Sequence, residues 1–289
     1  MSAAAPLVVK LGGTTIAGQE HVLDQVAAVS RSRPVVVVHG GGKRVSAWLE
    51  RLGVPTRFED GLRVTDEASL EVTAAVLRGA INVELVAALS ARGCHAVGLS
   101  GVDGGLLVGE RVPGKGLVAS ITGIRHELLD ALLAGGSVPV IAPLAADRDG
   151  VVCNVNADDA AAGIARGLGG ARLVLLTDVE GIRGADGARI ASIDADGAEA
   201  LIADGVIAGG MIPKVRAALR AVGAAAGLAS GPGSGPAPRP PAREAVIANG
   251  ADPRALERAI GDVTFGTRIT ARPARAATRP RTQGAAHPA

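Results

Sequence analysis

Short unbroken runs of aliphatic residues recur along the chain and predict strands that are buried on both faces, as in a parallel sheet. The clearest run is the valine stretch at 35–38, which leads directly into three glycines. Comparable runs occur at 7–13, 95–100, 138–142, 172–177 and 245–248, and a shorter one at 266–269 is expected to form the last edge strand. The strands of one sheet are therefore distributed over most of the chain.

Helical spacing fills the intervals between these runs. Apolar residues recur three or four positions apart in the segments 45–52, 67–77, 83–91, 128–133, 160–168, 198–203, 213–222 and 253–259. In the helix at 67–77 we expect Leu70, Ala74 and Leu77 to face inward. Asp66 and Asn156 stand where helix N-caps are needed. Alternating strands and helices predict the α/β class, as a three-layer α/β/α sandwich around a mainly parallel open sheet.

We expect two lobes that share this sheet, residues 1–171 and 172–271. One glycine-rich turn near the N-terminus and a set of charged loops after Thr177 suggest the division. The segment 228–243 is rich in Gly, Pro and Ser and is expected to be a disordered insert. The segment 272–289 is expected to be a disordered basic tail.

Composition and charge exclude several classes of protein. The 289-residue chain has a net charge of +2, but the tail holds four arginines and no acid, so the body is mildly acidic. A nucleic-acid-binding protein would carry a basic face on the fold itself. No apolar run reaches the roughly 20 residues of a membrane span, and Cys94 and Cys153 give no disulfide framework. We therefore expect a cytoplasmic protein that binds neither nucleic acid nor membrane.

The glycines at 40–42 and Lys10 are the first candidates for chemistry. The glycines lie between a buried strand and a helix start, where backbone N–H groups can approach an anion. Lys10 is embedded in the strand at 7–13, and burying its charge is costly unless an anion meets it. We favour a phosphate-binding role over that of a solvated edge lysine. His39 is interpreted as structural.

Other polar residues stand at unusual positions. Arg63 follows a glycine in a predicted loop and can bind a carboxylate through two hydrogen bonds, although a lone loop arginine is more often solvated. Asn154 and Asn156 precede a helix with Asp158 in its first turn, yet a cap needs only one asparagine. Lys214 lies in the first turn of another helix, where a cation opposes the helix dipole. Residues that break a local rule often mark functional sites.

The segment 109–116 has the opening of a phosphate-binding P-loop and is rejected as one. Gly116 stands where the motif requires Ser or Thr to hold Mg²⁺, and no strand leads directly into it. The surrounding glycine-rich region, 104–123, is expected to form a hairpin flap.

Six segments together resemble the amino-acid kinase family. They are Lys10-Leu-Gly-Gly13, His39-Gly-Gly-Gly42, Gly61-Leu-Arg-Val-Thr65, Asn154-Val-Asn-Ala-Asp158, Thr177-Asp-Val-Glu-Gly-Ile182 and Gly209-Gly-Met-Ile-Pro-Lys214. Each is weak alone, but they follow the order of the family across residues 7–269. The resemblance implies the amino-acid kinase fold, with acceptor binding and dimerisation in 1–171 and ATP binding in 172–271. It also implies ATP-dependent phosphorylation of the side-chain carboxylate of N-acetyl-L-glutamate, giving an acyl phosphate for arginine biosynthesis.

The resemblance also implies a role for individual residues. Lys10 and Lys214 would stabilise the transferring phosphoryl group from opposite sides, and Asp158 would orient both lysines. The acceptor would be bound by Gly41, Gly42, Arg63 and Asn154. The ATP site would consist of Gly12, Gly13, Asp178, Val179, Glu180, Gly181, Ile182, Arg183, Val206, Ile207 and Ala208.

The expected cofactors are ATP and Mg²⁺, with the metal held mainly by the ATP phosphates and water rather than by protein ligands. An ionised carboxylate acceptor needs no general base, so no histidine cluster is required. The expected assembly is a homodimer that arginine does not inhibit. Arginine-inhibited members of the family carry an extra N-terminal helix, and few residues precede Leu7 here.

Alternative functions remain open. Within the family, a kinase for aminoadipate or glutamate linked to a carrier protein shares the scaffold, and Val83 stands where the family usually has a lysine. A catalytically inactive amino-acid sensor would also keep the fold. The segment 39–42 resembles the oxyanion loop of esterases, but that fold requires a Gly-x-Ser-x-Gly elbow, which the sequence lacks.

Overall fold

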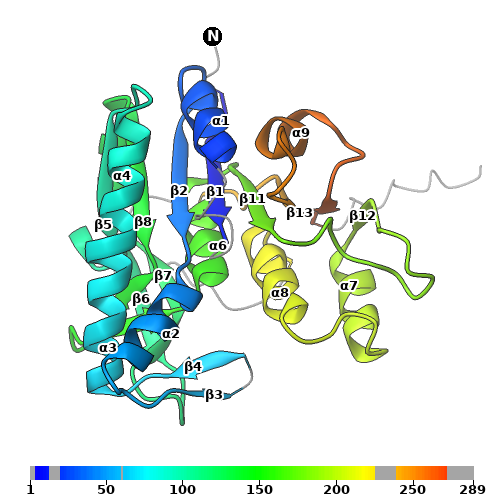
Figure 1. The fold of residues 1–289 in the computed structure, drawn as a ribbon. Coiled ribbons are helices and arrows are strands. Elements are labelled where there is room, and N and C mark those ends of the chain that lie inside the picture. Colours follow the sequence, from blue (N-terminus) through cyan, green and yellow to red (C-terminus); the bar gives the residue numbers. More distant parts are fainter. Residues whose placement is uncertain (1–3, 13–19, 60, 225–238, 272–289) are drawn as a thin grey trace, which may run out of the picture.

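One eight-stranded sheet runs through the computed structural model, which describes residues 4–12, 20–59, 61–224 and 239–271 (Figure 1). Its strands are β1 (Leu7–Leu11), β2 (Val35–His39), β5 (Ala96–Ser100), β8 (Val138–Ala142), β11 (Arg172–Thr177), β12 (Ser192–Ile193), β13 (Glu244–Asn249) and β14 (Thr267–Ile269). Their order is β12-β14-β13-β11-β1-β2-β8-β5, and every neighbouring pair except β13–β14 is parallel. The predicted mainly parallel sheet is confirmed.

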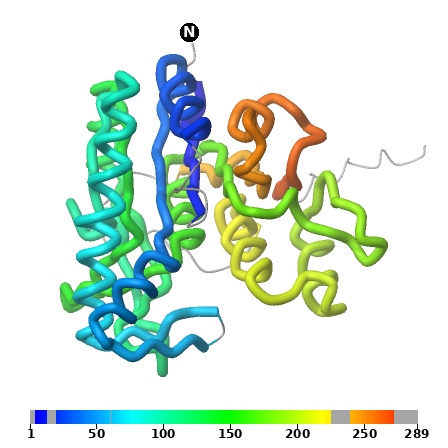
Figure 2. Tube along the Cα trace, viewed as in Figure 1, coloured from blue at the N-terminus to red at the C-terminus, as the bar shows by residue number. Residues whose placement is uncertain are grey.

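The expectation that 266–269 forms the edge strand is wrong. β14 lies between β13 and β12, because Ser192 and Ile193 pair with its outer side. A two-residue strand has no hydrophobic periodicity, so the sequence carried no signal for β12. One continuous sheet contains strands from both expected lobes, because β1 of the first lobe pairs directly with β11 of the second. These two segments are the blue and green ones that lie side by side near the centre of Figure 2.

Helices cover both faces of the sheet, which confirms the three-layer sandwich. One core contains buried residues of α5 (Glu127–Ala134), α6 (Ala157–Leu168), α7 (Ala195–Ala203) and α8 (Met211–Ala221); the other contains those of α1 (Glu20–Ser30), α2 (Gly42–Arg51), α4 (Asn82–Ser90) and α9 (Ala255–Gly261). Val8 and Val36 belong to the first core, whereas Val9 and Val37 belong to the second. Because side chains alternate along a strand, Lys10 lies on the same face as Val8, toward α6 and α8.

A single helical run of 24 residues, Glu67–Ser90, replaces the two helices expected at 67–77 and 83–91. It consists of α3 (Glu67–Ala74), the π-helical turn η1 (Ala75–Ile81) and α4. By length and composition this run is apolar enough to cross a membrane, a test that core helices also pass. Here α4 packs against β5 and β8.

The expected inner face of the helix at 67–77 is confirmed in part. Leu77 is buried and Ala74 packs against the core, whereas Leu70 is only half-buried. Ser69 and Thr73 are buried as well, so the inward face of α3 also carries small polar side chains.

Two hairpins meet beside the sheet. One is formed by β3 (Arg57–Glu59) and β4 (Leu62–Val64). The other, β6 (Leu107–Arg111) with β7 (Val118–Ile124), confirms the predicted hairpin and joins β9 (Leu144–Ala146) and β10 (Val152–Val155) in a small closed barrel. The N–H of Thr65 donates to the carbonyl of Lys115 over 3.1 Å, and that of Leu117 donates to the carbonyl of Thr65 over 2.6 Å.

The contact between the hairpins explains Gly116. Its φ is +67°, and a Cβ there would lie 2.3 Å from the carbonyl oxygen of Thr65. Only glycine has room at this point and adopts this conformation without strain. The apparent P-loop is therefore a turn between β6 and β7, in agreement with its rejection.

The segment 228–238 of the expected insert and the tail 272–289 lie outside the described residues. Residues 239–243, which the composition grouped with the insert, have defined contacts. Arg239 forms an ion pair with Asp130 over 2.7 Å, and the N–H of Ala242 donates to the carbonyl of Ala221 over 3.0 Å. Residues 239–243 are therefore part of the fold, which corrects the expectation of a disordered insert as far as residue 243.

Candidate active site

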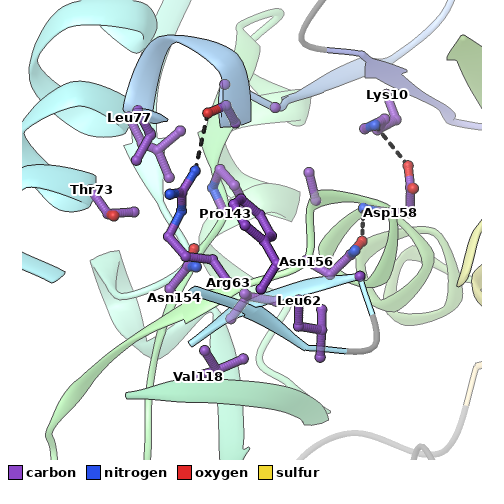
Figure 3. A pocket seen from close by; sticks show the side chains of 18 of the residues that line it. Lys10, Leu62, Arg63, Thr73, Leu77, Val118, Pro143, Asn154, Asn156 and Asp158 are labelled. Carbon is purple, nitrogen blue, oxygen red and sulfur yellow. Dashed lines mark hydrogen bonds and ion pairs between the residues drawn. The ribbon is translucent and has the colours of Figure 1, made fainter. Parts of the chain in front are cut away.

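A cavity of about 270 Å³ lies at the carboxyl ends of β1 and β2. Its walls come from the glycine loop 40–42, the β3–β4 hairpin, the helix carrying Thr73 and Leu77, the small barrel and the start of α6 (Figure 3). In open α/β sheets, ligands bind just beyond the carboxyl ends of the strands. The cavity therefore lies where this fold class places its ligands.

Two ammonium groups meet one carboxylate at the edge of this cavity. Lys10 Nζ lies 2.8 Å from Asp158 Oδ1, an ion pair that Figure 3 shows as a dashed line. Lys214 Nζ donates to Asp158 Oδ2 over 2.9 Å. The side chains of Lys10 and Asp158 are 7% and 6% exposed, and that of Lys214 is 22% exposed. Three elements, β1, α6 and α8, are thus joined at one buried point.

Local structure explains how each charge reaches this point. The alternation of β1 directs Lys10 toward α6 and α8. The side chain of Asn156 caps α6 by accepting the N–H groups of Asp158 over 2.8 Å and Asp159 over 3.3 Å. This cap was expected, and it places Asp158 in the first helical turn. Lys214 lies in the first turn of α8, as the sequence predicted.

Burial and neighbouring charges lower the pKa values of both buried partners, Lys10 and Asp158. Burial raises the pKa of Asp158, but the ammonium groups of Lys10 and Lys214 outweigh it, and the pKa lies below its usual range. Burial lowers the pKa of Lys10 despite the opposing effect of Asp158, and Lys214 lowers it further. With both lysines charged, the cluster carries one excess positive charge and attracts a further anion.

Arg63 lies in the wall of the cavity. It belongs to strand β4, which corrects the expectation of a loop position, and it is buried, which argues against the alternative of a solvated arginine. Its Nη2 donates to Ser46 Oγ over 2.8 Å and to the carbonyl of Gly42 over 3.2 Å, and its guanidinium stacks on the ring of Phe58 at 4.7 Å. Nη1 has no hydrogen-bond partner among the described residues. A buried guanidinium with a free N–H is suited to an acidic ligand.

Asn154 and the glycine loop complete the polar lining. Asn154 lies on β10, and its Nδ2 donates to Thr65 Oγ1 over 3.5 Å. Gly41 is the N-cap of α2 and Gly42 its first residue, and both line the cavity, so this helix begins at the site. A Cβ on Gly41 would lie 2.4 Å from Ile81 Cδ1, so a larger residue would have to displace the Ile81 side chain. Gly12 is buried after β1, and Gly13 lies outside the described residues.

His39 is held in the opposite layer from Lys10. Its Nδ1 contacts the carbonyl of Gly40 at 2.9 Å, and Asn82 Nδ2 contacts its Nε2 at 3.2 Å. Because a carbonyl only accepts, Nδ1 is the donor and Nε2 receives the amide hydrogen. Burial lowers the pKa of His39 to about 4. The neutral ring thus fixes the start of the glycine loop, in agreement with a structural role.

Comparison with known proteins identifies the family. The sequence model described as the amino acid kinase family matches residues 5–226. The chain belongs to the amino acid kinase family. It is 46% identical over 215 residues to an acetylglutamate kinase of Rubrobacter xylanophilus, covering 74% of this chain and 84% of that protein. It is 36% identical over 272 residues to an acetylglutamate kinase of Dehalococcoides mccartyi, covering 91% and 94%.

Solved structures agree on the fold. The N-acetylglutamate synthase of Neisseria gonorrhoeae, determined with coenzyme A and N-acetyl-glutamate, superposes with a TM-score of 0.76 at 22% identity. The superposition covers 93% of this chain and 60% of the synthase chain. At this identity the match shows the shared fold alone.

In this amino acid kinase family member, the expected ATP-binding residues at 178–183 and 206–208 do not line the cavity. Asp178, Val179, Glu180 and Arg183 are exposed in the loop after β11, while Val206 and Ala208 precede α8. Gly181, Ile182 and Ile207 are buried. The N–H of Ile182 donates to Thr267 Oγ1 and that of Ile207 to the carbonyl of Leu201, each over 2.9 Å. Their assignment to the nucleotide site stays a prediction.

Several lining residues were missed by sequence reasoning. Phe58, Leu62, Thr73, Val118 and Pro143 all face the cavity. Leu62 adjoins Arg63 within a recognised motif, and Thr73 is a polar residue on a buried helical face, so both carried a signal. Phe58, Val118 and Pro143 come from other segments of the chain and reach the cavity only through the tertiary fold, so they carried no local signal.

The described residues hold no group of three or more His, Cys, Asp or Glu side chains that could bind a metal ion. Asp158 is engaged by two lysines. This donor set does not fit a metal held by protein ligands.

Proposed function

We propose that the chain transfers the γ-phosphoryl group of ATP to the side-chain carboxylate of N-acetyl-L-glutamate, a step of arginine biosynthesis. The observation that carries the proposal is the meeting of Lys10 and Lys214 on Asp158 at the edge of a cavity that contains a buried arginine. The acetylglutamate kinase relatives support the choice of acceptor.

The acceptor would be oriented by groups at the two ends of the cavity. Arg63 offers the unpaired Nη1, and with Asn154 it would bind the α-carboxylate. The N–H groups of Gly41 and Gly42 would hold the side-chain carboxylate near Lys10 and Lys214. Fixing both ends of a flexible dicarboxylate removes much of its entropy before the reaction.

In the reaction, a carboxylate oxygen forms a bond to the γ-phosphorus while the bond to the β,γ-bridging oxygen breaks. The electron pair leaves with ADP, and no proton moves because the acceptor is already ionised. Lys10 and Lys214 would neutralise the charge that spreads over the phosphoryl oxygens, and Asp158 would hold both in place. The N–H groups of Gly12 and Gly13 would contact the phosphates.

We propose that the nucleotide is bound by the exposed loop after β11, with residues 178–183 and 206–208. Mg²⁺ would enter with the ATP phosphates and neutralise part of their charge. The lobe 1–171 would bind the acceptor and form the dimer contacts, and the lobe 172–271 would bind ATP.

The test traps the acyl phosphate with hydroxylamine. The protein is supplied with ATP and one acceptor from a panel of N-acetyl-L-glutamate, L-glutamate, L-aspartate, L-2-aminoadipate and carbamate. We expect hydroxamate chiefly with N-acetyl-L-glutamate. Preferred use of aminoadipate would indicate the carrier-linked branch of the family instead, and no hydroxamate with any acceptor would indicate an inactive sensor.

Replacing Lys10 or Lys214 with alanine should lower kcat for N-acetyl-L-glutamate by about 10² or more, since each neutralises transition-state charge. Lys43 is exposed, lies outside the cavity and serves as the matched control. Lys43→Ala should change kcat less than twofold. Equal activities of the three variants would contradict the proposed roles.

We also propose a cytoplasmic homodimer that arginine does not inhibit. Light scattering should give the mass of two chains, and activity should persist with millimolar arginine. A hexamer, or loss of activity with arginine, would overturn this part.

A further inference from the structure

Thr73 is a buried polar residue whose role the phosphoryl transfer leaves unexplained. It lies on α3, is 2% exposed and lines the cavity. Its hydroxyl has no hydrogen-bond partner among the described residues. Figure 3 shows Thr73 and Lys10 on opposite sides of the cavity, with Arg63 between them in this view. Thr73 therefore borders the part of the cavity away from the reacting groups.

A buried hydroxyl without a partner is costly to the free protein. Threonine within a helix usually satisfies its hydroxyl by bonding a carbonyl three or four residues back, and no such bond is present at Thr73. Rotation between the two helical rotamers exchanges the hydroxyl and the methyl group, so the hydroxyl can turn toward a ligand. Arg63 Nη1 is unpaired in the same cavity. Two unpaired donors in one cavity indicate a ligand that accepts from both.

The cavity wall near these donors defines the chemistry of that ligand. Leu62, Leu77, Val118 and Pro143 give it apolar surface. Asp158 is the one carboxylate among the described residues that line the cavity, and two lysines engage it. A free α-ammonium group would therefore find no counter-charge, whereas a neutral amide with a small apolar group would be accommodated.

We propose that Thr73 determines acceptor specificity by donating a hydrogen bond to the acyl oxygen of an N-acylated amino acid. The inference rests on the proposed function and extends it from the carboxylates to the amide. The hydroxyl of Thr73 on α3 would thus discriminate between acylated and free amino acids.

The test compares Thr73→Val, which removes the hydroxyl at nearly constant shape, with Thr73→Ser, which keeps it. For N-acetyl-L-glutamate, Thr73→Val should raise KM about tenfold with kcat changed less than twofold. Thr73→Ser should stay within threefold of the wild-type KM. The residual use of free L-glutamate should be unaffected by either substitution.

Thermal unfolding separates this role from a purely structural one. Removing a hydroxyl that is unpaired in the free protein should raise Tm by about 2–4 °C in Thr73→Val. A fall in Tm with an unchanged KM would show that the hydroxyl supports the fold and would overturn the inference.

The two proposals fail in distinguishable ways. If the wild type phosphorylates N-acetyl-L-glutamate and Thr73→Val has the same KM, the inference is wrong and the proposed function stands. If the wild type phosphorylates no acceptor, calorimetric binding of N-acetyl-L-glutamate decides the inference. Weaker binding to Thr73→Val supports it, whereas equal affinities, or no binding to the wild type, overturn it.

Discussion

Arg220 on α8 forms an ion pair with Asp159 on α6, one residue after the carboxylate that Lys214 contacts. The same two helices are therefore joined at two points, once through Lys214 and Asp158 and once through Arg220 and Asp159. Burial raises the pKa of Asp159, while Arg220 opposes this effect. Arg220 lies outside the cavity lining, so its contribution is to hold α8 in position.

Replacing Arg220 with methionine should lower kcat about tenfold, because a displaced α8 carries Lys214 away from the reacting groups. The free energy of unfolding should fall by about 1–2 kcal/mol, since the pair is only partly exposed and Asp159 loses its partner. Arg216 lies on the same helix and is exposed, so Arg216→Met is the matched control. A normal kcat in Arg220→Met, with lowered stability, would show that the pair does not position Lys214.

The lowered pKa of Lys10 predicts the alkaline limit of activity. Burial favours the neutral amine, so Lys10 loses its proton below the ordinary lysine value of 10.5. We expect kcat/KM, measured by ADP release, to decline as pH rises through this lowered pKa, because kcat/KM reports the ionisation of the free protein. Lys10→Arg should be slower but should keep its activity to higher pH, because arginine stays charged. Identical alkaline limits in the two proteins would assign the decline to another group.

His39 predicts a dependence of stability on pH. Its pKa is lowered from 6.5 to about 4, so protonation favours the unfolded chain. The contribution of His39 is complete above pH 6.5 and is lost as pH falls toward 4, a difference on the order of 3 kcal/mol. Urea unfolding between pH 7 and 5 should show roughly 2 kcal/mol of this loss in the wild type and none of it in His39→Gln. His95→Gln, at an exposed histidine, should retain it.

Gly116 and Gly114 provide a matched test of the contact between the hairpins. Both have positive φ, but a Cβ on Gly116 would meet Thr65, whereas a Cβ on Gly114 would meet no atom within 4 Å. Alanine at either position should cost about 1–2 kcal/mol in backbone strain. Gly116→Ala should in addition raise KM for the acceptor at least fivefold, because Thr65 contacts Asn154. Equal KM values in the two variants would uncouple the hairpin contact from acceptor binding.

The sheet was predictable because parallel strands buried on both faces are unbroken apolar runs. The elements without that signal were missed. β12 is too short to show periodicity, and β3 is largely exposed. Helix α1 was also absent from the predicted helices, although it carried a signal. Its buried residues Val22, Leu23, Val26 and Ala27 have helical spacing.

The charged part of the site could be predicted from the sequence because both lysines stand at unfavourable positions. Lys10 places a charge within a buried strand, and Lys214 places a cation in the first turn of a helix. The walls of the cavity could not be predicted, because segments far apart in the chain form them. The inner face of α3 was predicted only in part. The apolar pattern found Ala74, which packs against the core, but it could not show that the small polar residues Ser69 and Thr73 are also buried. A hydrophobic pattern identifies apolar core positions and gives no signal for a buried polar residue.

The π-helical turn η1 lies between two parts of one long helix that make different contacts. Thr73 lines the cavity before this turn, and Asn82 contacts His39 after it. Wide helical turns of this kind are frequent at functional sites. If Thr73 selects the acceptor, as we propose, substitutions at the cavity end would change which acid is phosphorylated without disturbing the amide of Asn82, which supports the glycine loop through His39. Acceptor choice and the support of the glycine loop could then change independently within one helix.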